Sequence, residues 1–359
     1  MGVTAVGDYS QAPYRMALQR AAANGTLTVR TSSSIYVQQL QDETAQGFRT
    51  GRPALGPGDL AAKLVGEGKT ATANHWAPLA GRDGGDRETG GGSAWLRDGG
   101  LKVFLDGSLG GHTALLREPY EDRKGAADLH TGHGHGPGPT GARIWSDDEV
   151  SQHFGRAHAA GVQIHAHAIG DGAIDQGLAA YSRLAALNDL EGPGWGGNRL
   201  RHRFEHFEIV HEDQVRRCAE LGIVSSSQPN FVGEWSAKGG MYEDRLGSRY
   251  RLNNRFRAFK EAGIPLAFGS DGMPFGPLAG LQSALHHPDL SQRLAPDEAA
   301  WHYTFMAAWS LHWEDEIGSL QAGHRADLVI LETKELDSNP QEWGIMQTIA
   351  GGATVWTRN

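Results

Sequence analysis

Four short polar clusters carry residue types needed for hydrolytic chemistry, and each follows an apolar run typical of a β-strand. They are KVFLDG at residues 102–107, IHAHAIGD at 164–171, RFEHFE at 203–208 and FGSDGMP at 268–274. In a barrel of parallel strands, side chains at the carboxyl ends of the strands converge on one rim. The spacing therefore predicts one shared pocket, and its proposed members are Lys102, His167, His206 and Asp271.

These residue types suit metal-assisted hydrolysis of an amide. Such a reaction at neutral pH needs a nucleophilic water and a polarised carbonyl, and one metal ion supplies both. Imidazole nitrogens are ligands that zinc favours, and a carboxylate beside the water moves the proton to the leaving nitrogen. His165 lies two residues before His167, on the same face of the strand, and is the rival ligand one side-chain layer deeper.

Other polar residues of these clusters are candidates for supporting roles. We expect Asp171 or Glu205 to orient a ligand imidazole. Asp106 precedes a glycine, so it either supports the site or starts a turn.

Each candidate also has a purely structural interpretation. His167 and His206 could be buried histidines with hydrogen-bond partners in the core, and Lys102 a solvated charge at the end of a strand. Asp271 precedes Gly272 and shares the turn alternative of Asp106. The joint pattern favours the metal site.

The elements that must position these residues alternate between strand and helix. Strands are predicted over residues 3–6, 27–30, 101–105, 162–168, 201–207, 223–228 and 265–269, and helices over 14–23, 147–160, 173–187, 211–221 and 253–262. This alternation predicts an α/β fold with a parallel sheet of the TIM-barrel type. Seven barrel strands are expected rather than eight.

Composition narrows the function class. The 359 residues include 42 acidic and 33 basic ones, and the net charge of −9 argues against nucleic acid as a partner and favours a small-molecule substrate. The single cysteine, Cys218, excludes an internal disulfide and a CxxC zinc site. Neither a signal peptide nor a membrane span is recognisable, so a cytoplasmic protein is expected.

Two glycine-rich insertions interrupt the periodic segments, near residues 81–92 and 125–141. The second contains His130, His133 and His135, which either bind metal or belong to a flexible surface loop.

Five collinear segments resemble the amidohydrolase superfamily, specifically amidohydrolase family 3 with its YtcJ-like proteins and N-substituted formamide deformylases. They are KVFLDGSLGGHTALL, HAHAIGDGAID, RHRFEHFEIVHEDQVRRCAELGIVSSSQP, GIPLAFGSDGMPFGPLAGL and DEIGSLQAGHRADLVIL. The resemblance implies a metal-dependent hydrolase barrel over residues 1–318. Over residues 319–359 it implies the C-terminal part of a small β-sandwich domain.

The same resemblance implies a divalent metal, usually zinc, at the barrel mouth. Lys102 matches the strand-4 lysine that carries a carbamate in many relatives, which would convert a cation into an anionic oxygen ligand. His167 and His206 match the ligands of strands 5 and 6, and Asp271 matches the strand-8 aspartate that takes a proton from the attacking water. His112 stands where relatives often have arginine and is a candidate substrate contact.

One departure from the family pattern affects the expected metal count. Relatives begin with half of the β-sandwich and a first barrel strand that ends in His-x-His, whereas this sequence starts at the following segment, residues 2–8. We therefore expect an incomplete barrel with one metal per chain. Three explanations are a mis-assigned start codon, a truncated inactive product, and a short form whose unpaired edge closes in a homo-oligomer.

The expected function is hydrolysis of non-peptide carbon–nitrogen bonds in amide, N-acyl or N-formyl substrates, with Asp271 as general base and acid. One alternative is a truncated, non-catalytic barrel that binds only metal or a small ligand, and another is a structural subunit that pairs through its open edge. Trp235, Tyr242 and Tyr303 either line the pocket or belong to the core.

Overall fold

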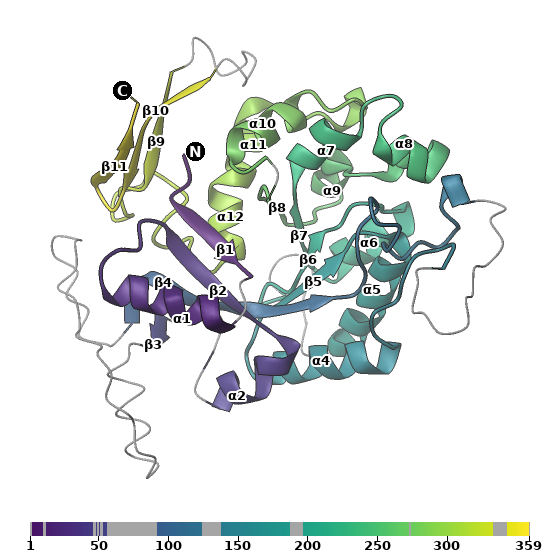
Figure 1. Ribbon diagram of the computed structural model, residues 1–359, viewed down its shortest axis with the longest axis horizontal. Coiled ribbons are helices and arrows are strands. Elements are labelled where there is room, and N and C mark those ends of the chain that lie inside the picture. Colours follow the sequence, from purple (N-terminus) through teal and green to yellow (C-terminus); the bar gives the residue numbers. More distant parts are fainter. Residues whose placement is uncertain are drawn as a thin grey trace.

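The computed structural model describes residues 2–9, 12–45, 48, 50, 53–55, 92–123, 138–186, 197–272, 274–332 and 343–358. Its larger sheet contains seven parallel strands in the order β1-β2-β4-β5-β6-β7-β8, with β3 antiparallel to β4 (Figure 1). The strands are β1 Ala5–Asp8, β2 Arg30–Tyr36, β3 Pro53–Leu55, β4 Gly92–Phe104, β5 Ile164–Ala168, β6 Arg203–His206, β7 Val224–Ser227 and β8 Leu266–Phe268.

The sheet curls into an open half-barrel (Figure 1). In the described part of the chain, β1 pairs only with β2, and β8 pairs only with β7. The prediction of an α/β fold with seven parallel barrel strands is confirmed. The absence of a first family strand stays a prediction.

Helices lie on the outer side of the sheet and above its carboxyl end (Figure 1). They are α1 Ala12–Ala23, α2 Leu40–Ala45, α4 Asp147–Ala159, α5 Asp171–Ala186, α6 Glu212–Glu220, α7 Pro229–Trp235, α8 Met241–Leu246, α9 Phe256–Glu261, α10 Pro277–Leu285, α11 Pro296–Tyr303 and α12 Phe305–Ser310. A capping box of Ser146 and Glu149 starts α4, as expected where an acidic residue follows a serine by three positions. Among the described helices, none is both long and apolar enough to cross a bilayer.

Alternation along the strands separates the core from the barrel interior. Ile164, Ala166 and Ala168 of β5 are fully buried in the main apolar core. The residues between them, His165 and His167, must then point to the opposite face of the sheet, because strand side chains alternate with a period of two. The period-two pattern thus places the polar side chains of the strands inside the barrel.

One strand lies away from its predicted position. The prediction of a strand at residues 27–30 was wrong, because β2 occupies Arg30–Tyr36, a segment rich in serine. Ser32, Ser33 and Ser34 are nevertheless buried, and Ser34 Oγ lies 3.3 Å from His165 Nδ1 and 3.1 Å from the Gly100 amide nitrogen. Apolar periodicity cannot find a strand whose buried face is polar.

A separate antiparallel sheet follows the barrel, in the order β11-β10-β9, with β9 Leu328–Glu332, β10 Gly344–Ala350 and β11 Ala353–Thr357. It lies beside the N-terminal segment (Figure 1), where Gly2 is close to Val329 and Ile345. These strands were expected outside the barrel; the domain boundary at residue 318 stays a prediction. The insertions at 81–92 and 125–141, with His130, His133 and His135, lie outside the described residues except for 92 and 138–141.

Candidate active site

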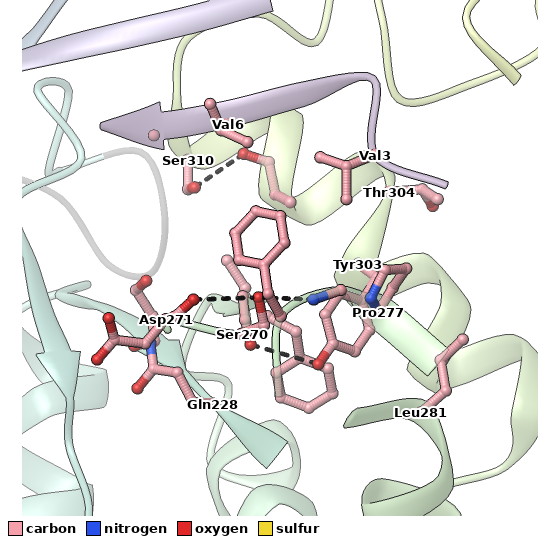
Figure 2. Close-up of a pocket in the computed structure, with 18 of the residues that line it drawn as sticks. Val3, Val6, Gln228, Ser270, Asp271, Pro277, Leu281, Tyr303, Thr304 and Ser310 are labelled. Carbon is pink, nitrogen blue, oxygen red and sulfur yellow. Dashed lines mark hydrogen bonds between the residues drawn. The ribbon is translucent and has the colours of Figure 1, made fainter. Parts of the chain in front are cut away.

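A cavity of about 1270 Å³ extends from the carboxyl ends of the strands to the space between β1 and β8. Figure 2 shows part of its wall, with Val3 and Val6 from the segment of β1 and with Gln228, Ser270 and Asp271 across from them. Lys102, His167, His206 and Asp271 all line this cavity, so the structure brings the four predicted residues to one pocket.

His167 and His206 form the centre of the site. Their ring centroids are 4.4 Å apart, and Gln228 Oε1 lies 2.8 Å from His206 Nδ1, which orients that ring and leaves Nε2 free of this contact. His167 Nε2 lies 3.1 Å from the carbonyl oxygen of Gly107. Two imidazoles from adjacent strands are therefore neighbours, as metal ligation requires.

The backbone explains how His206 reaches the cavity. Strict alternation would place it on the helix-facing side of β6, with Phe204. His206 and Phe207 instead adopt the left-handed region, with φ of 75° and 51°, which ends the strand there. The turn lets the imidazole join His167 at the cavity wall.

Both imidazoles are neutral at physiological pH. Burial lowers the pKa of His167 well below its ordinary value, and the neighbouring His206 and Lys102 act in the same direction. Burial also lowers the pKa of His206 to about 4, with Lys102 adding to the effect. Neutral imidazole is the form that coordinates a metal.

Lys102 lies in the interior with its ammonium nitrogen 4.4 Å from the Tyr9 ring centroid and 4.9 Å from that of Phe104. Burial lowers the pKa of Lys102 to about 8, although Glu205 opposes this effect. The interpretation of Lys102 as a solvated charge at the end of a strand is therefore wrong, because only 4% of the residue is exposed.

Asp271 follows β8 and is exposed at the cavity. Its φ of 51° is left-handed, a conformation that aspartate tolerates better than most residues. The Asp271 carboxylate, at the rim of the cavity, acts to raise the pKa of both His206 and Lys102. Aspartate in this place is a suitable proton acceptor.

Sequence reasoning missed an interior network below Lys102. Tyr9 Oη donates to Glu205 Oε1 at 2.5 Å, and Arg203 Nε donates to the same oxygen at 2.5 Å. Burial opposes ionisation of Glu205, but Arg203 and Lys102 hold the pKa of its carboxyl well below its usual range. Glu205 therefore binds Tyr9 and Arg203 rather than orienting a ligand imidazole. Period-two spacing from Glu205 could have pointed to Arg203; no local signal pointed to Tyr9.

His165, the rival ligand, does not line the cavity. Its Nδ1 lies 3.3 Å from Ser34 Oγ and its Nε2 2.8 Å from Gln163 Oε1, so both ring nitrogens have partners. The structural interpretation fits His165 better than the ligand role.

Three residues predicted to have supporting roles, Asp106, Asp171 and His112, do not line the cavity. Asp106 accepts hydrogen bonds from the Leu115, Ile169 and Gly170 amides, which is a loop-anchoring role, although its Oδ1 is 3.6 Å from His167 Nε2. Burial raises the pKa of Asp106 to about 8.

Asp171 begins α5 and contacts His211 Nε2 at 2.9 Å, so it does not orient His167 or His206. His112, with a left-handed φ of 54°, contacts Asp122 at 2.9 Å instead of facing the cavity. By contrast, Trp235, Tyr242 and Tyr303 do line it.

The ligand atoms available at the site are of the types that a divalent metal accepts. His167 and His206 provide two neutral nitrogens and Asp271 a carboxylate, the ligand atoms that zinc accepts. Within the residues that the structure describes, no three His, Cys, Asp or Glu side chains lie close enough together to hold an ion. Among the described residues, the imidazole pair is thus the part of the predicted ligand set that is already assembled.

Comparison with known proteins places the chain in a family. The sequence profile Amidohydro_3, described as an amidohydrolase family, matches residues 1–356. The chain belongs to the amidohydrolase family. This confirms the assignment expected from the five collinear segments.

Two relatives of this amidohydrolase are the Bacillus subtilis protein YtcJ and the N-substituted formamide deformylase of Arthrobacter pascens. YtcJ is 27% identical over 285 residues, which cover 74% of this chain and 48% of YtcJ. The deformylase is 25% identical over 278 residues, which cover 73% of this chain and 46% of the enzyme. The chain thus spans about half the length of these relatives.

A solved structure, an uncharacterised metal-dependent hydrolase from Pyrococcus furiosus, is also similar to this amidohydrolase. It superposes with a TM-score of 0.65 and 25% sequence identity, over 90% of this chain and 55% of that chain.

Proposed function

We propose that this amidohydrolase cleaves non-peptide carbon–nitrogen bonds in small amide, N-acyl or N-formyl substrates, with one zinc ion per chain. The observation that carries the proposal is the pair of neutral imidazoles, His167 and His206, at the wall of a large cavity whose rim carries Asp271. The amidohydrolase family, the similarity to the N-substituted formamide deformylase and the similarity to the Pyrococcus metal-dependent hydrolase support the reaction class.

His167 and His206 would hold the metal, with Asp271 or Lys102 completing the set; a carbamate on Lys102 would give it an anionic oxygen. The bound metal supplies Lewis acidity for the water and the carbonyl. Asp271 accepts the proton of the attacking water and delivers it to the leaving nitrogen. Gln228 fixes the His206 ring, so that its Nε2 is presented in a constant direction.

The test combines elemental analysis with activity on a panel of N-formyl and N-acyl amines. Wild-type protein should bind about one zinc per chain and hydrolyse members of the panel. His206→Ala should lose both properties, whereas His286→Ala, which removes an exposed imidazole on the surface, should keep them. A wild-type protein that takes up no zinc and hydrolyses none of the panel would instead fit the non-catalytic barrel.

A further inference from the structure

A row of aromatic contacts leads away from the imidazole pair along the cavity wall. The ring of His206 lies 6.0 Å from that of Phe231, which lies 4.6 Å from Trp235, and Trp235 lies 6.0 Å from Tyr242. These residues and Glu208 all line the cavity. We name Glu208, Phe231, Trp235 and Tyr242 the aromatic lobe; it is built from α7, α8 and the segment just after β6.

Glu208 is the acidic member of the aromatic lobe; only 2% of it is exposed, and burial raises the pKa of its carboxyl to about 7. Tyr242 Oη donates to Glu208 Oε2 at 2.7 Å. Among the residues that the structure describes, no lysine or arginine forms an ion pair with Glu208, whereas the equally buried Glu205 is paired with Arg203 at 2.5 Å. Because buried carboxylates in proteins are normally matched by a cation, Glu208 lacks the partner that its position calls for.

The surroundings of Glu208 favour a cation from the cavity. The carboxyl of Asp271 interacts unfavourably with that of Glu208, so a cation is favoured over a second anion beside Glu208. The faces of tryptophan and tyrosine also attract ammonium groups. A carboxylate beside aromatic rings is the arrangement that binds a protonated amine.

We propose that the aromatic lobe binds a protonated amine on the substrate, with Glu208 as its counter-ion, Trp235 as its wall and Tyr242 holding the Glu208 carboxylate in place. This inference rests on the proposed carbon–nitrogen hydrolysis and names its substrate class: N-acyl or N-formyl compounds that carry a second, basic amine. The lobe begins beside His206, so the amine and the scissile bond would occupy one continuous cavity. Glu208 is thus a specificity-determining residue and takes no part in breaking the bond.

The test compares two substrates that differ in charge but little in shape. These are mono-N-formyl pentanediamine and N-formylhexylamine, in which a methyl group replaces the ammonium. Wild-type kcat/KM should favour the ammonium compound by on the order of tenfold to a hundredfold, the value of a hydrogen bond to a charged group. Equal rates, or preference for the methyl compound, would overturn the inference.

Variants of the aromatic lobe test whether it causes the preference for the ammonium compound. Glu208→Gln keeps the shape and removes the charge, so the preference should fall close to one, whereas Glu220→Gln on the exposed end of α6 should leave it unchanged. Trp235→Leu, at a half-buried position, should reduce the preference without altering Glu208. An unchanged preference in both lobe variants would contradict the assignment.

Failure of the proposed function is separable from failure of this inference. If wild-type protein hydrolyses neither compound, calorimetry with the same two formyl compounds measures recognition alone. Tighter binding of the ammonium compound that is lost in Glu208→Gln would support the lobe while the hydrolytic proposal fails. Equal binding of the ammonium and methyl compounds would overturn the lobe itself.

Discussion

The hydroxyl of Tyr9 donates a 2.5 Å hydrogen bond to Glu205 across the barrel interior, between residues 196 positions apart in the sequence. Arg203 also contacts this hydroxyl, at 2.7 Å. Burial raises the pKa of Tyr9 well above its ordinary value, so the phenol stays protonated and remains a donor. The contact links the segment after β1, at one edge of the described sheet, to the interior strand β6.

Tyr9→Phe should lower the free energy of unfolding by about 1–3 kcal/mol, because it removes a donor from a buried carboxylate. The measurement is urea unfolding followed by circular dichroism. Tyr14→Phe is the matched control, since Tyr14 is 64% exposed, and its effect should stay within about 0.5 kcal/mol. A Tyr9→Phe protein as stable as wild type would show that the contact contributes nothing.

Gln228→Ala should weaken zinc binding about tenfold to a hundredfold, the usual cost of removing the residue that orients a ligand histidine. Gln163→Ala is the matched comparison, because Gln163 contacts His165 at the same 2.8 Å distance that Gln228 keeps from His206. Competition with a chelator measures both affinities. If His165 were the ligand, the Gln163 variant would show the greater loss.

His302 should make the protein lose stability in mild acid. Burial lowers its pKa to about 4 in the folded state; Nδ1 contacts the Leu266 carbonyl oxygen, and Nε2 has no partner among the described residues. In the unfolded chain this histidine takes up a proton near pH 6.5. The stabilisation that comes from keeping His302 neutral is therefore complete above pH 6.5, and the free energy of unfolding falls by about 3 kcal/mol as the pH drops towards 4.

Urea unfolding at several pH values tests this dependence. His302→Gln should flatten the curve between pH 6.5 and 4, whereas His286→Gln at an exposed position should leave it as in wild type. Parallel curves for wild type and His302→Gln would refute the assignment.

Two helix glycines should respond in opposite directions to alanine. A Cβ on Gly177 of α5 would overlap the Phe204 ring, so Gly177→Ala should destabilise by about 1–3 kcal/mol. A Cβ on Gly155 of α4 would meet open space, so Gly155→Ala should stabilise by about 0.5–1 kcal/mol. Thermal unfolding of both variants measures whether each substitution raises or lowers the stability. A change in the same direction for both would contradict the packing described for these two glycines.

Part of this structure could be predicted because it depends on local pattern. Apolar runs and amphipathic repeats predicted β5 to β8 and the helices α5, α6 and α9, but not α7 and α8. Because the ends of parallel strands converge, the same pattern predicted that Lys102, His167, His206 and Asp271 share one cavity. Contacts between segments far apart in the sequence have no local signal, so the contact of Tyr9 with Glu205 could not be predicted. The sequence around His112 likewise carried no sign of the left-handed turn that directs it to Asp122.

The left-handed backbone at His206 bears on whether this chain is an evolutionary relic. A histidine costs roughly 1–2 kcal/mol in that conformation, which a glycine would adopt freely. A barrel selected only to stay folded would gain by replacing it. His206 and Asp271 both carry this strain and both line the cavity, and because strained backbone clusters at active sites, these two positions are a reason to test this chain for activity.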